Sequence, residues 1–232
     1  MSLSFLLQIQ TQAEEAITDG VVDKPLWDIV KESSQGFGLI INIVLALMLG
    51  YAIFVFVERF LALRKATKEE AGLLSKIKDY IVDGKIDSAK DFCARSNSPS
   101  ARMIEKGLSR LGRPIETISA SIENTGKLEV LRLEQRLSFL ATAAGAAPMI
   151  GFLGTTVGMV IVFIDLGNAT SLELSIIAPG IMTAMITTVE GLIVGIISYI
   201  GYNFLVARIG RVVYQMENDA LEFMDLLHQP GK

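Results

Sequence analysis

Residues 138–165 read SFLATAAGAAPMIGFLGTTVGMVIVFID, and residues 175–207 read SIIAPGIMTAMITTVEGLIVGIISYIGYNFLVA. Both stretches are apolar and rich in Gly, Ala and Thr, and a short polar segment separates them. The first stretch carries no charge before Asp165, and the second carries one, Glu190. Because about 20 apolar residues cross the hydrocarbon core of a bilayer, the two stretches predict a pair of transmembrane helices.

An earlier stretch, residues 33–57, is also free of charge and predicts a further span. The chain has 232 residues, of which 51% are hydrophobic, and its mean hydropathy of +0.47 is too high for an ordinary soluble domain. We therefore expect an all-α membrane protein with three transmembrane helices, at residues 33–57, 137–164 and 174–207. Residues 165–173 then form a periplasmic loop.

Between the first and second spans lies a polar insert, residues 58–136. It contains helical patterns that are broken at Gly84, at 97–99 and at 112–114, and no strand-like alternation. Near its end, four leucines follow helical spacing among Glu and Arg residues, which predicts one uninterrupted helix from the insert into the second span: Leu128, Leu131, Leu137 and Leu140.

Positive charge predicts the orientation. Most of the 21 Lys and Arg residues lie in 58–136, whereas 165–173 contains none. Because basic loops stay on the cytoplasmic side, the N-terminus should be outside, and the insert and C-terminus inside. For residues 1–32 we favour a periplasmic segment with an amphipathic helix at the membrane surface. A processed or disordered end is the alternative.

The third span is longer than a bilayer requires. As a helix, residues 174–207 would extend about 50 Å, against a hydrocarbon core of about 30 Å. Its apolar period continues into residues 208–232. We expect a cytoplasmic C-terminal helix there, packed beside an extended second helix.

Soluble enzyme chemistry has little support in the sequence. The chain has a single cysteine, Cys93, and a single histidine, His228, and it lacks the phosphate-loop, HExxH, GxSxG and GxGxxG motifs. The insert holds no cluster of acid, base and nucleophile, so a membrane-anchored enzyme is disfavoured. We expect no catalytic residues, no metal, no cofactor and no nucleic-acid partner.

Small residues recur on one face of each later span, at helical spacing. Such residues let helix backbones approach closely, and threonine hydroxyls can bond across the contact or back to their own helix. A plain packing stripe and a polar path are both open interpretations. The second span presents Ala144, Pro148, Gly151, Thr155, Gly158, Val162 and Asp165; the third presents Ala184, Thr188, Gly191, Gly195 and Ser198, beside a polar stripe of Thr183, Thr187 and Glu190.

Glu190 lies roughly midway along the third apolar segment. An ionisable residue within a membrane span is costly and usually faces a protein interior or water, which favours a proton-exchanging role. Alternatively, the third span sits lower in the membrane, and Glu190 lies near the cytoplasmic headgroups. Asp165 is expected to be an exposed residue at the outer rim of the second span.

The blocks APMIGFLGTTVGM and IIAPGIMTAMITTVEGL, after one early span and a cytoplasmic insert, resemble the MotA/TolQ/ExbB proton-channel family. The resemblance is closest to its three-span ExbB/TolQ branch. It implies a homopentamer in the bacterial inner membrane, whose pore encloses the helices of a single-span partner, ExbD or TolR. An Asp of that partner takes up and releases protons, and the motion passes to TonB or TolA.

By position, Thr155 and Thr188 match the family threonines of the second and third spans, and Pro179 matches the proline that opens the third. One position departs from the family, because the carboxylate common early in the third span is Thr183 here. Glu190 follows seven residues later, on nearly the same helix face. Either Glu190 is a relocated carboxylate, or the partner's Asp and the threonines suffice.

The resemblance therefore implies a subunit that works with an ExbD-like partner to energise TonB-dependent outer-membrane transport. A TolQ-like subunit of the Tol-Pal system, a flagellar or gliding stator, and a pure scaffold are the alternatives. Stators of the MotA type usually have four spans. The expected proton-pathway residues are Thr155, Thr188, Thr183, Thr187 and Glu190, and the expected helix-packing residues are Gly151, Gly158, Pro179, Gly191 and Gly195.

Overall fold

The computed structural model describes residues 37–70, 72–96, 98–168 and 174–228. These residues form helices and no strand, and three of the helices are long and apolar enough to cross a membrane. The expected all-α fold with three membrane-spanning helices is thus confirmed. The amphipathic helix expected within residues 1–32 lies outside the described residues, and the orientation in the membrane stays a prediction.

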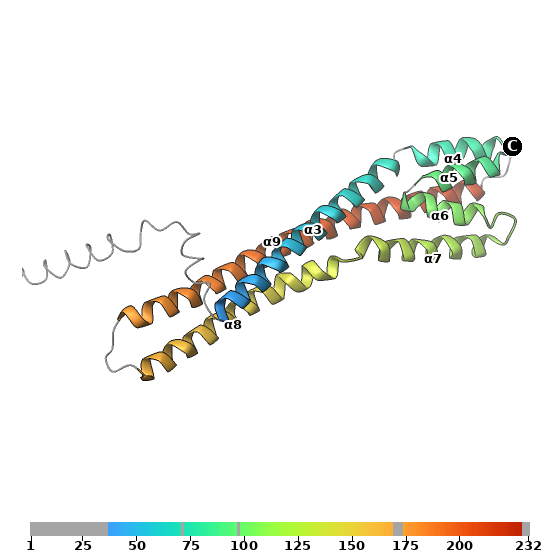
Figure 1. Ribbon diagram of the computed structural model, residues 1–232. Helices are drawn as coiled ribbons and strands as arrows, with labels where there is room; N and C mark the ends of the chain where they lie inside the picture. Colours follow the sequence, from blue (N-terminus) through green and yellow to red (C-terminus); the bar gives the residue numbers. More distant parts are fainter. Residues whose placement is uncertain (1–36, 71, 97, 169–173, 229–232) are drawn as a thin grey trace, which may run out of the picture. The chain divides into compact units, whose positions relative to one another are not determined.

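The three long helices are α3, α8 and α9, and four shorter helices connect α3 to α8 (Figure 1). α9 is a single helix of 55 residues, so the apolar period that continues past residue 207 lies within the same helix as the third span. The bounds are α3 Phe37–Glu70, α4 Leu73–Val82, α5 Ile86–Arg95, α6 Pro99–Leu108, α7 Ile115–Glu134, α8 Leu137–Asn168 and α9 Leu174–His228.

The described chain divides into two compact units, and each long helix contributes to both. The first unit contains residues 37–47, 147–168 and 174–193. In it, small residues such as Gly151 and Ala184 are buried, whereas large apolar side chains are exposed, including Met149 at 73% and Met185 at 62%. A soluble protein would bury the large side chains, so this inverted distribution suits helices that face lipid or other membrane helices.

The second unit contains the described residues of 48–146 and 194–228. Its core is formed by residues of α4, α5, α6 and α7 together with the C-terminal part of α9, where Met216 and Phe223 are buried. The helix breaks expected at Gly84 and at 112–114 fall between helices, and α6 begins at Pro99, the last residue of the break expected at 97–99. Gly84 and Gly112 have positive φ angles of 73° and 89°, which glycine adopts without strain.

The start of α6 shows how the sequence directs a helix end. Ser98 is the N-cap residue of α6, and its hydroxyl oxygen accepts a hydrogen bond from the backbone N–H of Ala101 at 3.1 Å. Pro99 follows at the first helical position, where its missing N–H leaves no donor unpaired. Further along, α6 packs tightly, because a Cβ atom on Gly107 would lie 2.8 Å from the ring of Phe223.

The expectation of an uninterrupted helix from the insert into the second span is wrong. α7 ends at Glu134, and α8 begins at Leu137. Gln135 has φ −50° and ψ 139°, and Arg136 has a positive φ of 64°. These angles fit the central positions of a type II turn, whose second central residue is usually glycine. The leucine spacing indicated helix on both sides of this turn but carried no sign of the turn itself.

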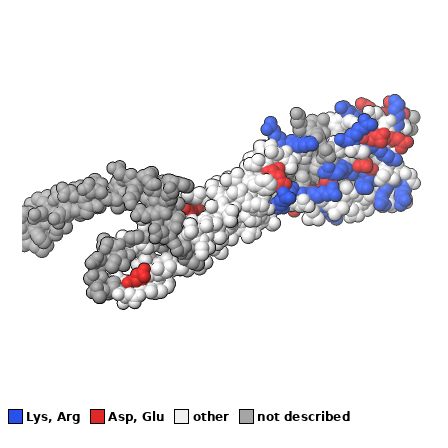
Figure 2. All heavy atoms as spheres, in the orientation of Figure 1, with Lys and Arg blue, Asp and Glu red and all other residues white. Residues whose placement is uncertain are grey.

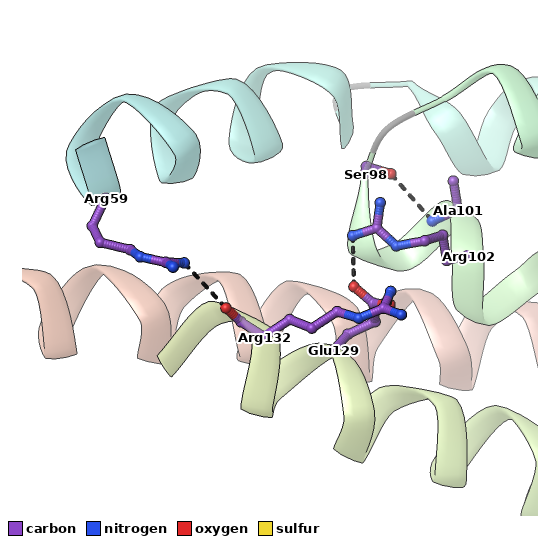
Figure 3. A network of polar contacts seen from close by, with 6 residues as sticks. All are labelled: Arg59, Ser98, Ala101, Arg102, Glu129 and Arg132. Carbon is purple, nitrogen blue, oxygen red and sulfur yellow. Dashed lines mark hydrogen bonds and ion pairs between the residues drawn. The ribbon is translucent and has the colours of Figure 1, made fainter. Parts of the chain in front are cut away.

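A buried carboxylate ties α6 to α7 (Figure 3). The side chain of Glu129 is only 3% exposed, and its two oxygens accept hydrogen bonds from the guanidinium groups of Arg102 and Arg132, each at 2.6 Å. Both arginines are more exposed than the carboxylate. A buried carboxylate is tolerated only when it is paired, so this pairing constrains how α6 meets α7.

Basic side chains gather over the short helices of the second unit (Figure 2). This surface corresponds to the insert of residues 58–136, which contains most of the Lys and Arg residues of the chain. Such a charged surface suits an aqueous environment rather than the hydrocarbon core of a membrane.

Cys93 should be unreactive in the folded protein. Its side chain is fully buried in the core of the second unit, and burial raises the pKa of the thiol to about 12, with a smaller contribution from the charge of Glu105. The thiolate is the nucleophile, so maleimide at pH 8 should label native protein slowly and denatured protein rapidly. A Cys93→Ala, Ala94→Cys variant, with the cysteine at an exposed neighbour, is the control that should label rapidly. Rapid labelling of native Cys93 would contradict the described core.

Removal of Arg102 should destabilise the second unit. Arg102→Ala leaves the buried Glu129 with one partner and should lower the free energy of unfolding by about 2 kcal/mol. Arg132→Ala should have a smaller effect, because the Arg132 side chain is 62% exposed. Denaturant titration followed by circular dichroism measures both. Equal effects would show that burial does not determine the strength of these pairs.

Candidate functional site

The candidate site lies in the first unit, where α8 and α9 cross at two glycines. A Cβ atom placed on Gly151 would lie 2.7 Å from the backbone oxygen of Thr187, and one placed on Gly191 would lie 2.6 Å from the backbone oxygen of Ala147. Real Cβ atoms do not approach backbone atoms so closely. The two backbones therefore touch, and only glycine fits at both positions.

This crossing brings three threonine hydroxyls together. Thr155 of α8 donates to the carbonyl oxygen of Ala184 at 3.0 Å, and its hydroxyl is also in contact with that of Thr188. Thr188 donates to the carbonyl oxygen of Gly151 at 3.3 Å. Thr187 donates to Ala184 at 2.8 Å, with Gly151 as a longer alternative at 3.4 Å. Two carbonyl groups, one from each helix, thus accept from all three hydroxyls.

The threonine cluster contains more hydrogen-bond acceptors than hydroxyl protons. Each hydroxyl donates one proton and accepts through two lone pairs. Thr155 alone has the carbonyl oxygens of Ala184 and Gly151 within reach, at 3.0 and 3.5 Å, besides the hydroxyl of Thr188. Several bonding patterns are therefore available without movement of the helices. A cluster of this kind can rearrange its protons when a further polar group approaches.

The three threonines differ in exposure. Thr187 is 1% exposed and lies inside the helix contact, whereas Thr155 and Thr188 are half-buried. A group outside this helix pair can therefore reach Thr155 and Thr188 but not Thr187. Of the threonines that the sequence singled out, the structure brings these three together.

Gly154 is a further contact residue that was not among those predicted from the sequence. A Cβ atom there would lie 2.5 Å from the hydroxyl oxygen of Thr187 and 3.0 Å from Ile41 of α3. Its spacing of three from Gly151 and four from Gly158 was the available signal. A Cβ atom placed on Gly158 would lie 3.0 Å from the Cβ atom of Ala184 and 3.5 Å from its Cα atom, which is tight but less severe than at Gly154.

The other expected site residues lie elsewhere on the helices. Thr183 and Glu190 are half-buried in α9. Pro179 lies within the first turns of α9. Gly195 belongs to the second unit, where it is buried. Asp165 is exposed on the last turns of α8.

The sequence model of the "MotA/TolQ/ExbB proton channel family" matches residues 95–218, which is just over half of the chain. The matched residues include all of α8 and most of α9, with every residue of the threonine cluster. The description is that of a proton channel family rather than of an enzyme class.

Individual relatives come from both the TolQ and the ExbB groups. The chain is 38% identical to the Tol-Pal system protein TolQ of Haemophilus influenzae over 101 residues, which are 44% of each chain. It is 29% identical to the biopolymer transport protein ExbB of Salmonella typhimurium over 187 residues, covering 74% of this chain and 73% of that one.

A third relative is the putative biopolymer transport protein ExbB-like 2 of Helicobacter pylori. The identity is 40% over 82 residues, which are 35% of this chain and 54% of the relative. The matches to this protein and to TolQ therefore span only about half of those relatives.

The resemblance noted from the two glycine- and threonine-rich blocks is thereby confirmed. With three apolar helices, the chain is a multi-pass membrane protein, and it belongs to the MotA/TolQ/ExbB proton channel family.

Proposed function

We propose that this protein is the channel subunit of an inner-membrane motor that uses the proton motive force, with an ExbD-like partner, to energise TonB-dependent outer-membrane transport. The observation that carries the proposal is the cluster of Thr155, Thr187 and Thr188 at the α8–α9 crossing. Membership of a proton channel family supports the same function. A helix pair that only anchors a protein in the membrane does not require three hydroxyls that share two carbonyl acceptors.

The proposed role of the threonines follows from their exposure and bonding. Thr155 and Thr188 are half-buried, so their hydroxyls can turn from the carbonyl groups toward a carboxylate on a partner helix. Each turn exchanges one hydrogen bond for another and leaves no buried donor unpaired. Thr187 stays within the contact and holds the two helices in register. Glu190 and Thr183, half-buried on α9, extend the proposed polar path.

The surroundings of the site are part of the proposal. We place the N-terminus in the periplasm, and the insert and the end of α9 in the cytoplasm, because basic residues concentrate in the insert. Five copies, by analogy with the family, would surround the single-span partner. Large exposed apolar side chains on α8 and α9 supply surface for lipid and for neighbouring copies.

A TolQ-like role in the Tol-Pal system is the second candidate. The chain is 38% identical to the Haemophilus TolQ protein and 29% identical to the Salmonella ExbB protein, and the match to ExbB is the longer of the two. Complementation separates the two roles. The protein and its own single-span partner are expressed together in two strains, one that lacks ExbB and one that lacks TolQ. The proposed function predicts that siderophore uptake is restored in the strain that lacks ExbB. Restoration of detergent resistance in the second strain alone would favour the Tol-Pal role.

Loss of a cluster hydroxyl should reduce proton flux. Thr155→Val and Thr188→Val keep the shape of the side chain but remove the hydroxyl, and each should lower partner-dependent proton flux by about tenfold. Thr155→Ser should retain most of the flux. Thr156→Val is the matched control, since Thr156 is exposed and its hydroxyl bonds only within its own helix, to Leu153. Flux is measured in proteoliposomes with co-purified partner, and full flux in both cluster variants would refute the assigned role.

Added Cβ atoms at the helix crossing should separate the helices. Gly151→Ala and Gly191→Ala force side-chain atoms against backbone oxygens, so they should lower the thermal unfolding midpoint and the yield of assembled complex. Gly145→Ala is the control, because a Cβ atom there meets no atom within 4 Å. It should be neutral or slightly stabilising in a helix. A neutral result for all three substitutions would mean that the helices are not in backbone contact.

A further inference from the structure

The turn between α7 and α8 stands out because its backbone conformation disagrees with its sequence. Arg136 is the single non-glycine residue with a positive φ angle among the described residues. A side chain with a Cβ atom disfavours this conformation, and neither Gly nor Asn is present at positions 135–136 to relieve it. The flanking residues have helical spacing, so a continuous helix is the local preference. Something outside the turn must hold the break.

The described contacts identify α3 as the element that holds the break. The carboxylate of Glu58 accepts a hydrogen bond from the Arg136 guanidinium at 2.5 Å. The next residue, Arg59, donates to the backbone carbonyl of Arg132 at 3.2 Å (Figure 3). Two adjacent residues of α3 thus contact the last turn of α7 and the connecting turn itself.

The bond from Arg59 substitutes for one that the turn removes. In an uninterrupted helix the Arg132 carbonyl would accept from the N–H of Arg136. Here the Arg132 carbonyl accepts a hydrogen bond from the guanidinium of Arg59. The carbonyl of Arg136 itself accepts from the N–H of Phe139 at 3.2 Å, at the start of α8. A backbone group orphaned by the break is therefore satisfied by α3.

A third contact continues the same pattern on the α8 side. The ring of Phe139 packs edge-on against Tyr51 of α3, with centroids 4.4 Å apart. Contacts from Tyr51, Glu58 and Arg59 therefore all act across the break, and all come from one helix. Displacement of α3 would remove them together.

We propose that the α7–α8 turn is a two-state switch, in which α3 holds the bent form through Glu58 and Arg59 and release of α3 lets residues 134–137 join the two helices. The helical form removes the positive φ of Arg136 and restores the bond from its N–H to the Arg132 carbonyl. It also changes the direction of the first turns of α8 relative to α7. Motion of a membrane helix is thereby converted into a change of backbone conformation in the second unit.

Two substitutions at one position separate the backbone preference from the ion pair. Arg136→Gly and Arg136→Ala both remove the guanidinium that pairs with Glu58. Glycine favours the positive φ angle and keeps the bent form, whereas alanine favours the helix. Glu58→Gln weakens the contact from α3 while Arg136 stays in place. Glu134→Gln, at an exposed neighbouring carboxylate, is the matched control.

Hydrogen–deuterium exchange of the full chain in nanodiscs, resolved by mass spectrometry for peptides within residues 131–141, tests the proposal. Amides that gain helical bonds exchange more slowly, so Arg136→Ala should slow exchange by about tenfold or more. Arg136→Gly and Glu134→Gln should exchange as the wild type does, and Glu58→Gln should fall between the wild type and Arg136→Ala.

Equal exchange in Arg136→Ala and Arg136→Gly would overturn the proposal. Protection of Cys93 from maleimide reports whether the second unit is folded in each variant. If Arg136→Ala fails this check, Glu58→Gln decides, and wild-type exchange in that variant overturns the proposal as well. The readout involves neither a partner nor proton flow, so its outcome is independent of the function proposed above.

Discussion

Contact between the backbones of α8 and α9 at Gly151 and Gly191 is the constraint on which the candidate site depends. Any side chain at either position would meet a backbone oxygen of the other helix at less than 3 Å. Because the backbones touch, hydroxyls on one helix reach carbonyls on the other, as Thr155 reaches Ala184 at 3.0 Å. Lipid offers little hydrophobic driving force for such a contact, so close packing and these hydrogen bonds must stabilise it. The same bonds hold the half-buried hydroxyls of Thr155 and Thr188 beside these carbonyls, which is the arrangement on which the proposed function rests.

The second unit is stabilised in a different way. It buries large side chains such as Phe223 around α6, α7 and the end of α9, and it admits one buried carboxylate, Glu129, which two arginines pair. Among its described non-glycine residues, Arg136 in the α7–α8 turn is the one with an unfavourable positive φ angle. A positive φ angle at a residue with a Cβ atom costs roughly 1–2 kcal/mol, and a half-exposed ion pair such as Arg136–Glu58 contributes at most about 1 kcal/mol. These two terms are of similar size, so the turn depends on the further contacts that α3 makes.

Much of this arrangement could be predicted from the sequence, because its signals are local. Long apolar stretches predicted the three spans, and helical spacing placed Gly151 with Thr155 on one face of the second span and Thr188 with Gly191 on one face of the third. Glu190 was harder to place, since its depth and neighbours depend on how the helices rotate against one another. The turn at Arg136 could not be predicted at all. Its local pattern favours a helix, and the bent form depends on Glu58 and Arg59, which are more than 70 residues away in the chain. Contacts between distant residues leave no trace in a single sequence.

Cysteine cross-linking across the helix pair is the most direct test of the central claim that α8 and α9 are in contact through their small-residue faces. Gly158→Cys and Ala184→Cys place two thiols where the Cβ positions are 3.0 Å apart, close to the 3.5–4.5 Å typical of disulfides. In membranes treated with a mild oxidant, with Cys93→Ala as background, this pair should form an intramolecular disulfide rapidly. A control pair, Val160→Cys with Ala184→Cys, moves one thiol to an exposed position and should stay reduced. Failure of the first pair to cross-link, or equal cross-linking of both pairs, would contradict the account.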